Sequence, residues 1–242
     1  MEFFHEVAIL TILIFFQSIF GVGLLLFGTP TFLYFDYSFS ETLSLLLPLS
    51  FVFSLIQFIN SKEKDKNFIY KFNIFTLPSM ALSLILLLSF QNFINLKIFI
   101  SVMLIVLSLI SFQKKALSNF ILKNKFKNIF LILLGFIHGF TNMGGGFLAL
   151  YSNVIVKNNK NLTRYFISYG YLIMVSVQLI ILFIIDNNFN YNNLFFIFLV
   201  LIVYIPTQFI YKKINHEKFS FFIKIIAIFY GFFVLISSLK IN

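Results

Sequence analysis

The chain carries, at residues 136–151, the stretch FIHGFTNMGGGFLALY, in which three consecutive glycines interrupt an apolar run. Each glycine costs a helix interior about 1 kcal/mol relative to alanine, so a continuous helix through Gly144, Gly145 and Gly146 is disfavoured. In a bilayer, a broken backbone persists only where it is buried in protein or lines a polar cavity. The stretch therefore predicts a helix break that serves a function inside a membrane protein.

The composition of the whole chain also indicates a membrane protein. Of 242 residues, 60% are hydrophobic and 11% are charged, which is more apolar surface than a soluble chain of this length can bury. The absence of cysteine excludes disulfides and thiolate sites. A net charge of +10 would suggest nucleic acid for a soluble protein. Here the lysines lie in loops between apolar stretches, so we expect a lipid bilayer around the protein and no nucleic-acid partner.

Eight apolar stretches can be marked along the chain. Six of them have the roughly 18–22 residues that one helix needs to cross a bilayer core of about 30 Å. The first and fifth are longer and contain the glycine breaks, so they either cross as tilted, broken spans or enter the membrane and return on the same side. The stretches are residues 7–35, 42–60, 72–90, 96–113, 127–156, 165–185, 191–211 and 219–239.

Positive charge distinguishes these two topologies. If all eight stretches cross, the 18 lysine and arginine residues divide ten to eight between the two faces. If the first and fifth are re-entrant, sixteen fall on one face and only Lys97 and Lys240 on the other. Short basic loops are retained on the cytoplasmic side, which favours the second division. We therefore predict an all-α integral membrane protein with six spanning helices, two re-entrant hairpins and both termini outside.

This topology makes the two halves of the chain inverted repeats. A shift of 121 residues superposes residues 1–121 on residues 122–242, each half being a broken hairpin followed by three crossings. Inverted repeats with broken helices near the midplane are typical of secondary transporters, whose substrate site lies at the repeat interface. The shift pairs Gln17 with His138, Gly23 with Gly144 and Gln57 with Gln178.

The two breaks also resemble the motifs of a known family. The first reads GVGLLLFGTP at residues 21–30, like a Gly-x-Gly…Pro signature, and residues 139–151 resemble the matching glycine motif of the second half. With Arg164 beyond the second hairpin, these motifs are similar to those of the sulfite exporter TauE/SafE family of anion transporters. Leu24 and Leu25 depart from the family, since many members carry further glycines there. The resemblance implies export or uptake of small sulfur-containing or organic anions, driven by an ion gradient.

The hairpin tips offer a site for such an anion. A half-helix that restarts after a break exposes unpaired N–H groups and the positive end of its dipole, and glycines let an anion approach closely. Close packing of helices through small residues is the alternative reason for glycines here. The candidate substrate-binding residues are Thr141, Asn142, Gly144, Gly145 and Gly146, mirrored in the first half by Gly21, Gly23 and Thr29.

Acidic residues are confined to the loops and to the ends of the apolar stretches. A cation pathway or an acidic proton relay normally places carboxylates inside the membrane, so their distribution favours a neutral or anionic substrate. It also leaves no paired carboxylates for acid–base catalysis. Because the chain contains no phosphate loop, zinc-binding helix motif or serine triad, we predict that it is not an enzyme and holds no metal or cofactor.

Several polar side chains within or beside the apolar stretches have two possible roles. His138 could carry a coupling proton, or it could be a neutral histidine bonded between helices. Gln17, Gln57 and Gln178 are costly in lipid unless they are paired, so they should face the interior and either line a pathway or join helices. Arg164, the only arginine, could grip an anion bidentately or act as a cytoplasmic topology anchor.

Together these features predict a secondary transporter of small anions in the cytoplasmic membrane of a bacterium, with a proton or another ion as coupling partner. The alternative is a membrane accessory or assembly protein without transport activity, and a channel is a third possibility. Tyr169 and Tyr171 could line the pathway, although their aromatic rings equally suit packing between helices.

Overall fold

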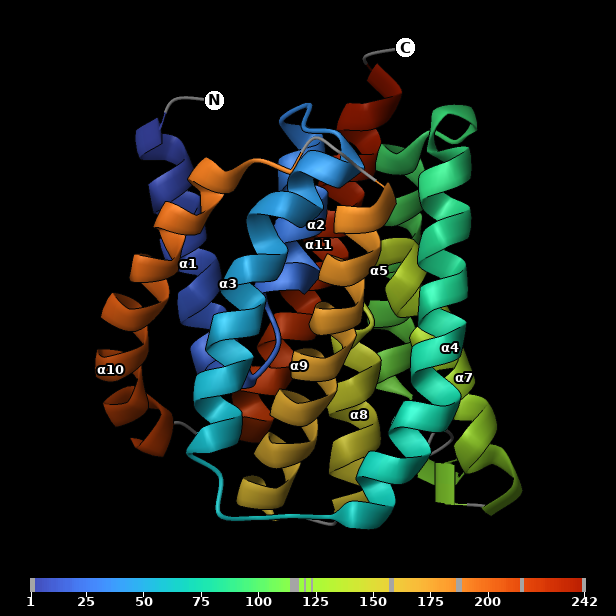
Figure 1. The fold of residues 1–242 in the computed structure, drawn as a ribbon, viewed down its shortest axis with the longest axis vertical. Helices are drawn as coiled ribbons and strands as arrows, with labels where there is room; N and C mark the ends of the chain where they lie inside the picture. Colours follow the sequence, from blue (N-terminus) through green and yellow to red (C-terminus); the bar gives the residue numbers. More distant parts are fainter. Residues whose placement is uncertain are drawn as a thin grey trace.

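The computed structural model describes residues 3–113, 118–119, 121–122, 124–156, 159–185, 189–213 and 216–240 (Figure 1). Every regular element in these ranges is helical. The elements are α1 (Phe3–Phe20), α2 (Leu24–Tyr34), α3 (Phe39–Ile59), α4 (Lys66–Phe90), η1 (Gln91–Phe93), α5 (Leu96–Phe112), α7 (Asn124–Thr141), α8 (Gly145–Val156), α9 (Lys160–Ile185), η2 (Tyr191–Phe196), α10 (Ile197–Lys213) and α11 (His216–Lys240). Charged residues of the sequence that lie outside the described ranges are Glu2, Lys114, Lys115, Lys123, Lys157 and Asp186.

The helices have the length and surface of a membrane protein. Among the described residues, α1, α3, α4, α9 and the run from η2 into α10 are long and apolar enough to cross a bilayer. Large apolar side chains cover their outer faces, including Leu82 on α4 and Ile202 on α10, which are 59% and 68% exposed. Extensive exposed apolar surface of this kind marks a lipid-facing protein. The prediction of an all-α multi-pass membrane protein is confirmed.

The two long apolar stretches are interrupted where the glycines predict a break. Residues 21–23 separate α1 from α2, and residues 142–144 separate α7 from α8. The remaining six stretches form single helical runs close to their expected bounds, although α4 begins six residues and α9 five residues earlier than expected. In α4 this extension is supported by Asp65, whose side chain accepts a hydrogen bond from the N–H of Phe68 and so caps the helix start.

In each broken pair the two helices run antiparallel. The hydroxyl of Tyr37, just after α2, donates a hydrogen bond to Glu6 at the start of α1. The rings of Phe130, early in α7, and Tyr151, late in α8, stack with centroids 5.9 Å apart. Each pair therefore begins and ends at the same end of the bundle, α1–α2 at the end that carries both termini and α7–α8 at the opposite end (Figure 1).

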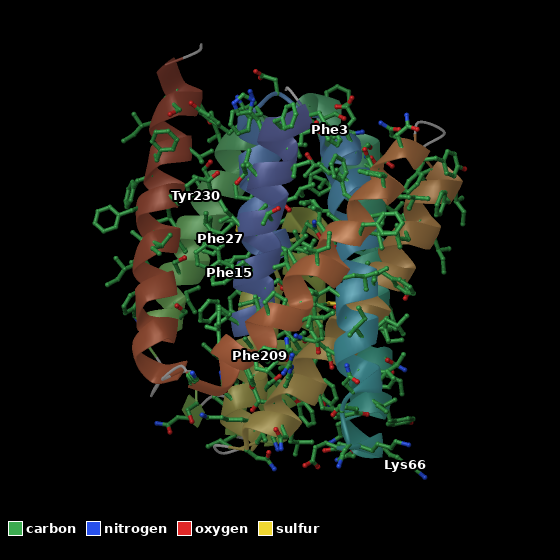
Figure 2. All side chains as sticks on the ribbon, turned by 90° about the vertical axis from the view of Figure 1, so that its left-hand side faces the viewer. Phe3, Phe15, Phe27, Lys66, Phe209 and Tyr230 are labelled. Atoms are coloured by element: carbon green, nitrogen blue, oxygen red, sulfur yellow. The ribbon has the colours of Figure 1, made fainter. Side chains whose placement is uncertain are left out.

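The two ends of the bundle differ in charge. Figure 2 places Phe3 at one end and Lys66 at the other. The loop that joins α3 to α4 lies at the Lys66 end, where Glu63 and Asp65 balance its Lys62 and Lys64 (Figure 1). The starts of α7 and α9 lie at the same end and add Lys127, Lys160 and Arg164 to it. At the Phe3 end, Lys97 forms an ion pair with Asp36.

Helix packing follows the same scheme in the two halves. Helix α4 packs on α7 as α10 packs on α1, and α2 packs on α3 as α8 packs on α9. The pairs α3–α9 and α5–α11 make the other large contacts, and each joins elements that the 121-residue shift makes equivalent. Each of these contacts therefore has a counterpart in the other half.

Candidate functional site

Both breaks are built on the same backbone turn. Gly21 follows α1 with a φ of 72°, and Asn142 follows α7 with a φ of 59°, both in the left-handed region that glycine and asparagine tolerate best. The N–H of Gly21 bonds to the carbonyl of Gln17 at 2.8 Å, and that of Asn142 bonds to the carbonyl of His138 at 2.7 Å. A left-handed residue is a frequent way to end a helix, and here it occupies positions that the 121-residue shift pairs.

A side chain from the preceding turn then caps the start of the next helix. Oε1 of Gln17 accepts a hydrogen bond from the N–H of Leu24, the first residue of α2, at 3.2 Å. Nδ1 of His138 accepts one from the N–H of Gly144, directly before α8, at 3.1 Å. Gln17 and His138 thus satisfy N–H groups that a helix start otherwise leaves unpaired. Because Nδ1 accepts, the proton of the neutral His138 ring lies on Nε2.

From His138 a buried chain of hydrogen bonds crosses to the first half of the molecule. Nε2 of His138 donates to Oε1 of Gln178 at 3.1 Å, and Nε2 of Gln178 donates to Oδ1 of Asn142 at 3.3 Å. Nδ2 of Asn142 then donates to Oγ1 of Thr29 on α2 at 3.1 Å. All four side chains are fully buried. The structure therefore brings four of the predicted site residues together where α2, α7 and α9 meet.

The glycines at the start of α8 permit close approaches. A Cβ atom on Gly145 would lie 1.4 Å from the hydroxyl oxygen of Tyr171, and one on Gly144 would lie 2.5 Å from Cβ of His138. A Cβ atom on Gly146 would meet nothing within 4 Å. Gly144 and Gly145 thus let α8 start against α7 and α9, whereas the space beside Gly146 is open.

The first turn of α8 has the chemistry of an anion site. The N–H of Gly146 reaches the carbonyl of Met143 only at 3.5 Å, the limit of a hydrogen bond. The 12-residue helix behind it directs the positive end of its dipole toward this turn. Asn142, Met143 and Gly145 are buried. An anion placed here would accept backbone N–H bonds in surroundings of low dielectric constant, where such bonds are strong.

Thr141 and Gln57, two further candidate site residues, lie outside the buried chain of hydrogen bonds. The hydroxyl of Thr141 donates to the carbonyl of Ile137 at 2.7 Å and accepts from the N–H of Met143 at 3.1 Å, so it stabilises the turn itself. Gln57 is buried near the C-terminal end of α3, and its Nε2 has no hydrogen-bond partner among the described residues. All three predicted interior glutamines are buried, as expected, but Gln57 is not part of the chain that contains Gln178.

Arg164 belongs to a separate cluster. Its Nη2 donates to Oε1 of Gln208 on α10 at 2.8 Å, and its guanidinium lies 4.6 Å from the ring centroid of Tyr211. Gln208 in turn donates to the hydroxyl of Ser18 on α1 at 3.2 Å. About 20 Å of α9 separate Arg164 from Gln178, given 1.5 Å per helical residue. Arg164 therefore joins α9 to α10 and α1, away from the α7–α8 break.

An open cavity of about 1220 Å³ lies at the Phe3 end of the bundle and is lined in part by Glu6, Tyr37 and Glu41. Burial, reinforced by the hydrogen bond to Glu6, raises the pKa of Tyr37 above its usual value. No lining residue of this cavity belongs to either break. Within the described ranges, no three histidine, aspartate or glutamate side chains come close enough together to hold a metal ion.

Two buried hydroxyl groups lie beside the candidate site; the sequence singles out Tyr171 only as a residue that could line the pathway or pack between helices, and it does not single out Ser50. Tyr171 on α9 and Ser50 on α3 are both fully buried, and the hydroxyl of each lacks a hydrogen-bond partner among the described residues. The 121-residue shift pairs these two positions, so paired hydroxyls at equivalent places in the halves were the signal that could have identified them.

Comparison with known proteins identifies a family. The model of the family described as Sulfite exporter TauE/SafE matches residues 7–237, a range that contains both breaks and the buried chain of hydrogen bonds between them. Comparison with curated proteins and with solved structures found no match. The family match agrees with the resemblance that the glycine motifs of the sequence indicate.

Proposed function

Since the chain belongs to the sulfite exporter TauE/SafE family of membrane transporters, we propose that it is a secondary transporter of small anions such as sulfite, sulfonates or related organic anions. The observation that carries this proposal is the pair of helix breaks, which are built alike and are joined by the bond between Asn142 and Thr29. Secondary transporters commonly aim the N-termini of broken helices at anionic substrates. The proposed location is the bacterial cytoplasmic membrane, and an ion gradient, of protons or another ion, would drive transport.

The proposed substrate site centres on the start of α8. Gly145 and Gly146 would offer backbone N–H groups, because the bond from Gly146 to Met143 is at the limit of a hydrogen bond. Gly144, whose N–H bonds to His138, would let the anion approach closely, and Asn142 would offer a side-chain amide. In the first half, the start of α2 would contribute in the same way. Gly21, Gly23 and Thr29 would support the site from the first break and the helix after it. Thr141 would shape the turn of the second break, and Arg164 would steer anions at the basic end. The interior polar groups of the proposed set are Gln17, Gln57, His138 and Gln178.

We further propose that α1–α2 and α7–α8 are re-entrant hairpins in two inverted repeats, residues 1–121 and 122–242. The return of each pair to its own end of the bundle supports the hairpins, and the matched contacts of the two halves support the repeats. Alternating access would then arise as one half rocks against the other around the two breaks. The basic end would face the cytoplasm.

Replacing Gly145 with alanine tests the site. The new Cβ atom would overlap the hydroxyl of Tyr171, so α8 must shift away from α9. Overpacking of a tight contact costs about 1–3 kcal/mol, so we expect sulfite flux into proteoliposomes to fall roughly tenfold or more. Leu133→Ala, on the exposed face of the preceding helix, is the matched control and should retain wild-type flux. Equal flux in Gly145→Ala and wild type would contradict the site.

A further inference from the structure

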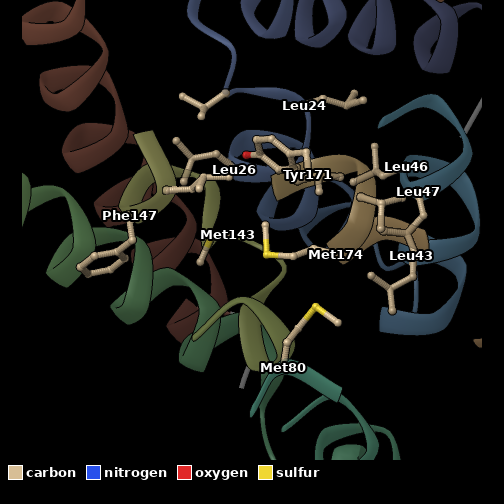
Figure 3. Packing of buried hydrophobic residues seen from close by; sticks show 14 of the residues in the cluster. Leu24, Leu26, Leu43, Leu46, Leu47, Met80, Met143, Phe147, Tyr171 and Met174 are labelled. Carbon is tan, nitrogen blue, oxygen red and sulfur yellow. The ribbon is translucent and has the colours of Figure 1, made fainter. Parts of the chain in front are cut away.

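The hydroxyl of Tyr171 is an unexplained polar group in the centre of the molecule. Tyr171 is fully buried, and its hydroxyl has no hydrogen-bond partner among the described residues. Figure 3 shows its ring among apolar side chains that include Leu24 and Met174. A buried hydroxyl without a partner costs about 1–3 kcal/mol, so phenylalanine would suit this position better if Tyr171 served only for packing.

This hydroxyl points at the start of α8. Its oxygen occupies the place where a side chain on Gly145 would begin, 1.4 Å from the position of an added Cβ atom. The Tyr171 ring also lies edge-on to His138, with centroids 6.2 Å apart. The unpartnered hydroxyl therefore lies at the first turn of α8, next to the open space at Gly146.

All the donors at this place are neutral. The sequence has no aspartate, glutamate, lysine or arginine between Lys127 and Lys157 or between Arg164 and Asp186, the segments that form the break and the part of α9 that faces it. The cost of moving an ion out of water rises with the square of its charge, whereas its attraction to a helix dipole rises only in proportion. Without a counter-ion, dipoles and hydroxyls therefore offset the desolvation cost of a monoanion far better than that of a dianion.

We infer that the hydroxyl of Tyr171 and the N-terminus of α8 together bind one oxygen of a singly charged oxyanion, such as hydrogensulfite or an organic sulfonate, and discriminate against dianions. This inference rests on the proposed transport function and specifies which anions it serves. Tyr171 donates its O–H to the anion, which supplies the partner that the hydroxyl lacks among the described residues. Ser50 occupies the equivalent position on α3, and its hydroxyl also lacks a hydrogen-bond partner among the described residues.

The first test compares Tyr171→Phe with Tyr169→Phe in the purified full-length protein, using methanesulfonate as the probe. A hydrogen bond to a charged group contributes about 1.5–3 kcal/mol, so Tyr171→Phe should bind methanesulfonate roughly 10- to 100-fold more weakly. Its thermal unfolding temperature without methanesulfonate should equal or exceed that of wild type, because an unpartnered group is removed. Tyr169→Phe loses a hydrogen bond to Asn73 at 3.0 Å, so it should unfold at a lower temperature and keep wild-type affinity.

The second test varies the charge of the probe at constant shape. Methylphosphonate passes from a monoanion to a dianion as the pH rises, whereas methanesulfonate remains a monoanion and reports any titration of the protein itself. Methylphosphonate binding should weaken at least tenfold, relative to methanesulfonate, as it becomes a dianion. Three results would overturn the inference. The methylphosphonate dianion could bind as tightly as the monoanion, the wild type could fail to bind methanesulfonate, or Tyr171→Phe could keep the wild-type affinity for methanesulfonate. If sulfite flux persists in these cases, the proposed transport function stands; if the wild type moves no anion, the transport function itself fails.

Discussion

Gln17 and His138 are different side chains that cap the helix starts after the two breaks. Each lies four residues before a left-handed residue, and each accepts a hydrogen bond from the backbone where the next helix starts. The amide of Gln17 has no proton to exchange near neutral pH, whereas the imidazole of His138 does. The second break therefore combines a structural cap with a group that can titrate, and only the second break does so.

Replacing His138 with glutamine should preserve the fold, because Gln17 already provides this cap in the first half. Replacing it with alanine leaves the N–H of Gly144 and Oε1 of Gln178 without their His138 partner, so the free energy of unfolding should fall by about 1–3 kcal/mol. Thermal or denaturant unfolding in detergent would compare the two variants. A glutamine variant less stable than the alanine variant would contradict the cap.

The same glutamine variant tests proton coupling. Protonation of His138 at Nδ1 would put a donor against the N–H of Gly144 and break the cap. If His138 carries the coupling proton, the flux of methanesulfonate through His138→Gln should lose the pH dependence seen in the wild type. Matching pH profiles in the two proteins would leave His138 as a purely structural residue.

At the scale of residues, the sequence predicted what local chemistry determines. The glycine break, the interior position of Gln178 and the polarity of the turn all follow from the cost of such groups in an apolar run. The hydrogen-bond partners of the polar side chains could not be predicted in this way, because many of them lie far apart in the sequence. Arg164, for example, bonds to Gln208 on α10, a contact between residues 44 positions apart that no pattern near Arg164 specifies.

At the scale of elements, the decisive feature is that each broken pair returns to the end where it started. The charge distribution of the sequence favours re-entrant hairpins, since only they collect the lysines on one face, and this topology in the membrane stays a prediction. Helix boundaries were less predictable: α4 begins at Lys66, in a polar stretch where hydropathy gives no signal, because Asp65 caps it. A cap depends on one side chain, whereas a hydropathy window averages over many residues.

Cysteine labelling tests the hairpins as elements. We expect a membrane-impermeant thiol reagent added to intact cells to label Phe93→Cys, in the exposed connection after α4, and to leave Lys62→Cys and Asn159→Cys unlabelled. Both protected positions should react once the cells are permeabilised, which controls for accessibility. If every apolar stretch crossed the membrane, Phe93 and Asn159 would lie on the same face, so joint labelling of these two positions would contradict the re-entrant topology.

At the scale of the whole molecule, helices α1–α5 meet helices α7–α11 through the pairs α4–α7, α3–α9, α5–α11 and α1–α10, and through the bond from Asn142 to Thr29. In the rocking motion that we propose, these matched contacts would rearrange around the bond from Asn142 to Thr29. The division into two repeats stays a prediction, which the sequence makes through a register shift with few identities. It could not indicate that Asn142 and Thr29 touch, since the contact joins residues of different halves and exists only after the helices pack.

The most direct measurement of the central claim is counterflow of sulfite in proteoliposomes that contain the purified protein. A carrier that alternates between two faces exchanges external labelled sulfite for internal unlabelled sulfite. Preloading the vesicles with unlabelled sulfite should therefore accelerate uptake of the label and produce a transient accumulation above the external concentration. Uptake that is unaffected by preloading, as in a channel, or the absence of protein-dependent uptake, would contradict the account.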